Sequence, residues 1–99
     1  MIEPLLSLKS SDTKFRLGVL RFTVGAYTTV PFEDIAAALA RHAAGDWGDL
    51  VDEDREENEF SLHKYLRLLS VYHDRYAVKF WIITEADRES TTVLLPEEY

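Results

Sequence analysis

The sequence predicts an α+β fold in which one main helix packs on a largely antiparallel four-stranded sheet. One run, residues 31–44, has helical periodicity. Four other runs are rich in β-forming residues, and three of these follow one another near the carboxyl end with short polar turns between them. We therefore expect residues 1–99 to form a single α+β domain in the order β-α-(acidic segment)-β-β-β, with a modest core.

The amino-terminal part contains one predicted strand after an irregular arm. Residues 1–14 are interrupted by a proline and by a Ser-Ser-Asp run, so we expect a loosely ordered N-terminal arm there. Apolar and polar residues then alternate from Phe15, which predicts a strand within residues 15–24. Gly25 is expected to end that strand.

The helix predicted over residues 31–44 carries clear signals at both ends. Pro31 suits the first helical position, where a missing N–H costs nothing. Apolar side chains recur every three or four residues and predict one buried stripe: Phe32, Ile35, Leu39 and Ala43. Gly45 is expected to follow the last turn in a left-handed conformation.

The segment 46–59, DWGDLVDEDREENE, concentrates the charge of the whole chain. It holds eight acidic residues and one arginine, whereas the other 85 residues carry ten acidic and ten basic groups. We expect a solvated short helix or an extended loop, anchored by Trp47 at one end and Phe60 at the other. Asp49 or Asp52 is the predicted cap of such a helix.

Three strands are predicted after the acidic segment. Residues 65–74, 77–84 and 91–95 are the apolar, β-rich runs, separated by short polar turns. The second run, AVKFWIIT, is apolar on both faces and is the predicted central strand, with Trp81 in the core.

Composition excludes several classes of protein. The chain has no cysteine, which rules out disulfides, thiolate metal sites and a cysteine nucleophile. No basic leader and no apolar run near ~18 residues is present, so we expect a cytoplasmic protein without a membrane partner. The acidic pI of about 4.8 argues against direct nucleic-acid binding.

One alternative function is a small metal-dependent or hydrolytic enzyme. His42, Asp46 and Asp49 are spaced so that a continuing helix would bring the imidazole and a carboxylate together, although glycines interrupt it. Ser70, His73 and Asp74 are the residue types of a catalytic triad, but neither a nucleophile elbow nor a glycine-built oxyanion loop accompanies them. No catalytic residue and no cofactor is assigned.

The acidic segment has two interpretations. A run of charge usually forms a solvated face that keeps a protein soluble. Spaced carboxylates can also imitate a phosphate path and occupy the basic groove of a nucleic-acid-binding protein. Trp47 itself either closes the main helix against the sheet or is a partly exposed contact residue. The predicted partner-binding residues are Trp47, Asp49, Asp52, Glu53, Asp54, Glu56, Glu57 and Glu59.

Three motifs resemble a known family. They are GDWGD at residues 45–49, KFWIITEADR at 79–88 and TTVLLPEEY at 91–99. With the residues between them they are similar, over about residues 36–99, to small proteins of plasmids, prophages and other mobile elements, often labelled plasmid-related protein. That family has no settled biochemical activity, so the resemblance implies a mobile-element setting and no catalytic residues.

The leading hypothesis is therefore a non-enzymatic, acidic interaction protein of a mobile genetic element. In that setting an acidic protein is expected to inhibit a nucleic-acid-binding defence system, as an anti-CRISPR or anti-restriction protein acting by DNA mimicry or steric block. A further alternative is a structural or regulatory homodimer joined through a sheet edge at residues 91–95 or 15–24.

Overall fold

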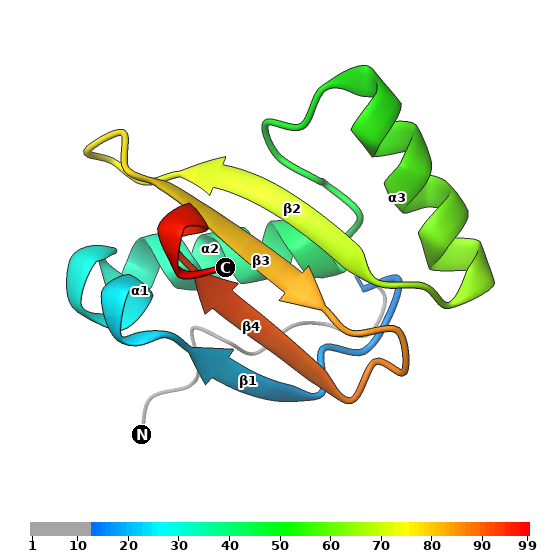
Figure 1. Cartoon of the computed structure of the whole chain (residues 1–99), viewed down its shortest axis with the longest axis horizontal. Helices are drawn as coiled ribbons and strands as arrows, with labels where there is room; N and C mark the ends of the chain where they lie inside the picture. The colour runs from blue at the N-terminus through cyan, green and yellow to red at the C-terminus, as the bar shows by residue number, and fades with distance from the viewer. Residues whose placement is uncertain (1–12) are drawn as a thin grey trace.

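The α+β fold class is confirmed in a computed structural model, which describes residues 13–99 (Figure 1). The predicted N-terminal arm lies outside the described residues, apart from its last two. The described helices and strands, in chain order, are β1 (Val19–Phe22), α1 (Val24–Thr29), α2 (Phe32–Ala43), α3 (Asp52–Lys64), β2 (Leu68–His73), β3 (Lys79–Thr84), β4 (Ser90–Leu94) and the 3-10 helix η2 (Pro96–Glu98).

The four strands form a mixed sheet in the order β1-β4-β3-β2. β3 pairs antiparallel with both β2 and β4, as the meander predicts, but β1 runs parallel to β4 with Val19 opposite Ser90. The expectation of a largely antiparallel sheet is thus only partly met. β4 lies inside the sheet, so the predicted dimer edge at residues 91–95 is wrong, whereas β1 is an edge strand of the described sheet.

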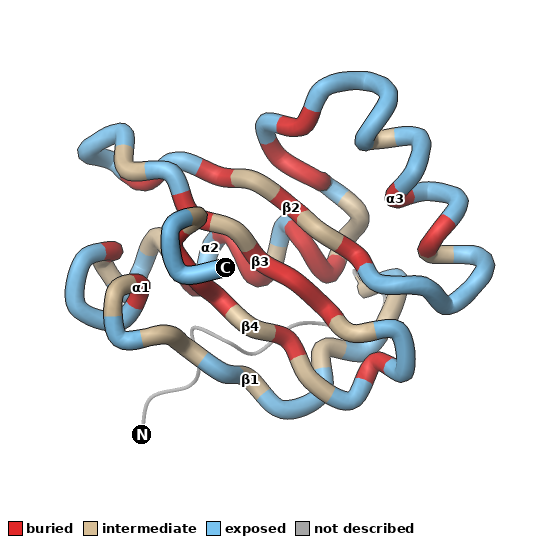
Figure 2. Tube along the Cα trace, in the orientation of Figure 1, coloured by how far each residue is buried: buried red, intermediate tan, exposed pale blue. Residues whose placement is uncertain are grey.

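Helix α2 covers one face of the sheet and forms the main core with it (Figure 1). Ile35 and Leu39 from the predicted stripe are buried against Tyr72, Phe80 and Ile82 of the strands. Figure 2 shows these buried positions along α2 and the inner strands, while α3 is mostly exposed. The helix predicted over 31–44 is correct to within one residue at each end.

The short helix α1 was not predicted. Thr23 precedes its first turn and accepts a hydrogen bond from the Ala26 N–H through its side chain, at 3.2 Å. The Glu98 carboxylate accepts hydrogen bonds from the Gly25 N–H at 2.8 Å and from the Thr23 hydroxyl. Gly25 therefore lies inside a helix tied to the carboxyl end of the chain, and it does not act as the predicted strand breaker.

The acidic segment forms a regular helix, α3, so the molecule has two substantial helices and not one. Its capping residue is Val51, which makes no side-chain cap hydrogen bond; the predicted caps Asp49 and Asp52 are therefore wrong. Phe60 is 57% exposed and does not anchor the segment. The helix continues to Lys64, and Tyr65 ends it with a left-handed φ of 56°, which is why β2 begins later than the strand predicted from residue 65.

The face of the sheet opposite α2 is only partly covered. The 3-10 helix η2 and Tyr99 lie over it in Figure 1. Trp81 lies between two residues that face α2 and so points to this open side, where its ring meets Tyr99 edge-on at 5.6 Å between centroids. Trp81 is half-buried, and its predicted place in the core is wrong.

Candidate functional site

The GDWGD turn holds Trp47 inside the protein. Its side chain is 2% exposed and stacks on the Phe15 ring at 6.2 Å between centroids. Its indole Nε1 donates a hydrogen bond to Glu59 Oε2 on α3 at 2.8 Å. Of the two predictions for Trp47, the interior one is correct, and this residue supports the acidic helix from beneath.

The same turn pairs with the edge of β2. The Val71 N–H donates to the Trp47 carbonyl at 3.3 Å, and the Asp49 N–H donates to the Val71 carbonyl at 2.7 Å. Gly48 between them has φ +75°, and a Cβ there would lie 2.0 Å from the Val71 oxygen. Only glycine fits this close, left-handed approach.

Asn58 closes the next position on that edge. Its side-chain Nδ2 donates to the Leu69 carbonyl at 2.6 Å, and its Oδ1 accepts from the Leu69 N–H at 3.2 Å. Asn58 thus takes the place of a neighbouring strand, because an edge strand presents alternate N–H and C=O groups that need partners. Helix α3 is fixed beside β2 by these contacts.

Two arginines also hold α3 in place. Arg55 turns inward and donates to the carbonyls of Leu50 at 3.0 Å and Gly48 at 2.6 Å. Arg88 donates to the carbonyls of Ser61 at 3.2 Å and Leu66 at 2.7 Å. Most of the inward face of α3 is therefore polar.

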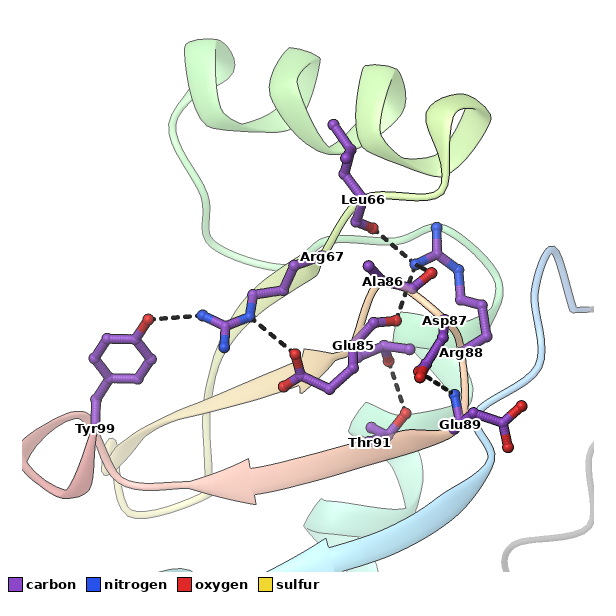
Figure 3. A network of polar contacts seen from close by, with 10 residues as sticks. Leu66, Arg67, Glu85, Ala86, Asp87, Arg88, Glu89, Thr91 and Tyr99 are labelled. Atoms are coloured by element: carbon purple, nitrogen blue, oxygen red, sulfur yellow. Dashed lines mark hydrogen bonds and ion pairs between the residues drawn. The ribbon is translucent and has the colours of Figure 1, made fainter.

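Figure 3 shows the contacts around the end of α3 and the start of β2. Arg67 donates to Glu85 Oε1 at 3.3 Å and to the Tyr99 hydroxyl at 2.8 Å. These partners raise the pKa of Arg67, with the Glu85 hydrogen bond the largest cause. Nothing in the sequence around Arg67 or Arg88 indicated that these two side chains would make these contacts.

Five of the six predicted contact carboxylates on α3 have no partner among residues 13–99. Within residues 13–99, no hydrogen bond or ion pair engages five exposed side chains of α3: Asp52, Glu53, Asp54, Glu56 and Glu57. The two remaining predicted carboxylates are engaged, Glu59 by Trp47 and Asp49 by His73 Nδ1 at 2.8 Å. The structure thus places five of the eight predicted residues on one helix with their side chains exposed.

The number of negative charges per unit length of axis in this part of α3 is close to that of duplex DNA. The six helical residues 52–57 extend about 9 Å along the axis at ~1.5 Å each, so one carboxylate falls every ~1.8 Å. Duplex DNA carries one phosphate charge per about 1.7 Å of its axis. The only basic residue in this interval, Arg55, turns inward.

The residues of the alternative metal or hydrolytic site point in different directions. His42 is fully buried, with Nδ1 2.5 Å from Ser70 Oγ and Nε2 2.9 Å from Thr84 Oγ1. Asp46 is bound by Arg41 Nε at 2.7 Å, which lowers the pKa of the Asp46 carboxyl, and Asp49 faces His73. In the described part of the chain no three potential metal ligands come together.

The triad types Ser70, His73 and Asp74 are likewise separated. Ser70 lies beside His42 in the core, while His73 is exposed and faces Asp49. Asp74 Oδ1 accepts from backbone N–H groups within its own hairpin turn. Its Oδ2 is buried and has no hydrogen-bond partner among residues 13–99.

Comparisons with known proteins add no relative. Neither a family model, nor a curated protein, nor a solved structure matches this chain. Among residues 13–99 no helix has both the length and the apolar character needed to cross a bilayer.

Proposed function

We propose that this protein is a non-enzymatic interaction protein whose helix α3 occupies the basic groove of a nucleic-acid-binding protein or complex. The observation that carries the proposal is the set of five exposed carboxylates to which residues 13–99 offer no partner, on a helix fixed from its other side by Arg55 and Asn58. Carboxylates that stabilised the fold would be expected to pair with the basic residues of this chain. These five are available to a partner.

The physics of such a contact mirrors that of nucleic-acid binding. A lysine- and arginine-rich groove gains affinity for a polyanion by releasing bound counterions. A folded acidic surface at similar charge spacing competes for that groove, and its rigidity lowers the entropy lost on binding. Phe60 lies exposed among the carboxylates and supplies an apolar contact, since aromatic residues dominate many interfaces.

The resemblance to mobile-element proteins suggests which complexes to test. In a cytoplasmic setting, a plasmid or prophage protein of this kind would act on a CRISPR or restriction complex. We therefore propose an inhibitor that binds the partner protein and makes no direct contact with nucleic acid.

The experiment compares two triple charge reversals in assays of DNA cleavage by CRISPR effectors and restriction enzymes. The first variant carries Glu53→Lys, Glu56→Lys and Glu57→Lys on α3. The control carries Glu33→Lys, Glu89→Lys and Glu97→Lys, which change the net charge equally on other exposed surfaces. The α3 variant should lose inhibition by at least about a hundred-fold, as ~1 kcal/mol per reversed contact implies.

The control variant should retain most of its inhibition. Equal losses of inhibition in both variants would show that inhibition depends only on net charge, which would contradict the role of α3. Absence of any inhibition by the unmodified protein across both classes of complex would contradict the choice of partner.

A further inference from the structure

A hollow of about 280 Å³ lies between α3 and β2. Its floor is apolar and is made by Leu50 and Leu69. Two of the carboxylates without partners, Asp54 and Glu57, line it. We call this space the α3–β2 hollow.

Ser61 gives the α3–β2 hollow an unused polar group. It is 5% exposed, it lines the hollow, and its hydroxyl makes no hydrogen bond to any residue that the structure describes. Its oxygen is not one of the fully buried atoms that lack a partner, so it opens onto the hollow, where an incoming N–H donor can reach it. The neighbouring Asn58 also lines the hollow, but its amide is already engaged by Leu69.

We propose that the α3–β2 hollow receives an arginine side chain of the partner, a proposal that rests on the function proposed above. Asp54, Glu57 and Ser61 lie three and four residues apart and therefore share one face of α3. A guanidinium presents five N–H donors in a planar fork and can reach several acceptors at once. The three methylenes of arginine would lie on the apolar floor.

Of the residues that the structure describes, Arg67 is the one cation that lines the hollow, and it already has polar partners. Its guanidinium is turned to Glu85 and Tyr99, as Figure 3 shows. Two carboxylates therefore remain for an incoming cation. Arginine fits better than lysine because an ammonium is a compact point charge that cannot bridge acceptors spread along a helix.

The test uses fluorescently labelled hexa-arginine and hexalysine peptides as probes of the complete protein. The unmodified protein should bind hexa-arginine about five-fold more tightly than hexalysine, a difference of the size that multiple guanidinium hydrogen bonds give. Asp54→Asn with Glu57→Gln should weaken hexa-arginine binding about ten-fold. The matched control, Glu53→Gln with Glu56→Gln, removes two charges from α3 outside the hollow and should weaken it about two-fold.

Ser61→Ala provides a second measurement that does not change charge. It should weaken hexa-arginine binding about three-fold and leave hexalysine binding unchanged, with circular dichroism and thermal unfolding confirming that each variant folds. If both double variants lost the same affinity for hexa-arginine, and the unmodified protein did not prefer hexa-arginine to hexalysine, the proposed arginine site in the hollow would be wrong. Helix α3 would then be a general acidic surface. Failure of the unmodified protein to bind either peptide would instead contradict the function proposed for α3.

Discussion

The imidazole of His42 lies fully buried between α2 and the sheet, where its surroundings decide its charge. It is flanked by the hydroxyls of Ser70 and Thr84, and both can donate or accept. Burial lowers the pKa of His42 to about 3, with a smaller contribution from the charge of Arg88. His42 lies in the last turn of α2, where a cation would interact favourably with the helix dipole, but the folded protein holds a neutral ring there.

This burial makes stability depend on pH. Below the ordinary histidine pKa of about 6.5, His42 binds a proton in the unfolded chain but stays neutral in the native protein. The free energy of unfolding therefore falls as pH falls from about 6.5 towards 3. The slope from His42 is about 1.4 kcal/mol per pH unit within that window. Urea unfolding at several pH values between about 6 and 4 should show this slope in the unmodified protein.

His42→Gln is the control, because glutamine can hydrogen-bond both hydroxyls and does not titrate. In this variant the free energy of unfolding should change less steeply with pH, by the contribution of about one proton. The carboxylates that form ion pairs contribute equally to the slope of both proteins. Identical slopes would show that His42 is protonated in the native state.

Among the elements, α2 and α3 differ in how far their sequences predict them. The apolar stripe of α2 indicates both that the helix exists and where it ends, so the helix predicted over residues 31–44 was nearly correct. On the inward face of α3, the side chains of Arg55 and Asn58 donate to the Gly48 and Leu69 carbonyls, and the Ser61 carbonyl accepts from Arg88. No periodicity in the sequence could reveal them, because an inward polar face looks like a solvated one until the strand beside it is known.

Replacing Asn58 tests whether these polar contacts seat α3. Asn58→Asp keeps the acceptor for the Leu69 N–H but puts a carboxylate oxygen where a donor faces the Leu69 carbonyl at 2.6 Å. We expect a loss of about 2–3 kcal/mol in the free energy of unfolding at neutral pH, the cost of an unsatisfied buried pair involving a charge. Faster hydrogen exchange at the Leu69 N–H should accompany it.

The loss should shrink in acid. The introduced carboxyl is stabilised in its neutral form, which can donate to the carbonyl, so its folded pKa lies above the unfolded value. Its stabilising form is present below the unfolded pKa and is lost as pH rises through the folded pKa. A difference from the unmodified protein that stays constant with pH would contradict the donor role of Asn58.

For the molecule as a whole, the sequence located the charge but not its surroundings. The concentration of acid in residues 46–59 is visible in the sequence, and five of its carboxylates are exposed on α3. The parallel pairing of Val19 with Ser90 joins residues from opposite ends of the chain, and nothing local distinguishes it from an antiparallel pairing. The α3–β2 hollow depends on how α3 packs beside β2, and this tertiary contact is likewise invisible in the sequence.

Carboxylates kept for a partner should cost the free protein some stability. Asp52 and Glu53 lie four and three residues before Glu56, spacings at which like charges destabilise a helix. Glu56→Lys removes both repulsions and creates an acid-to-base pair with Asp52 in the favourable order. We expect the midpoint of thermal unfolding to rise by about 3 °C at low salt.

Salt separates this electrostatic effect from a change in packing. At about 0.5 M NaCl the repulsion is screened, so the unmodified protein should gain stability and the advantage of Glu56→Lys should fall to less than about 1 °C. Glu97→Lys, which changes the net charge equally away from α3, should move the midpoint little at either salt concentration. If the higher midpoint of Glu56→Lys persisted in high salt, Glu56 would destabilise the helix for a reason other than charge. Helix α3 would then carry no electrostatic cost that binding to a basic partner could relieve.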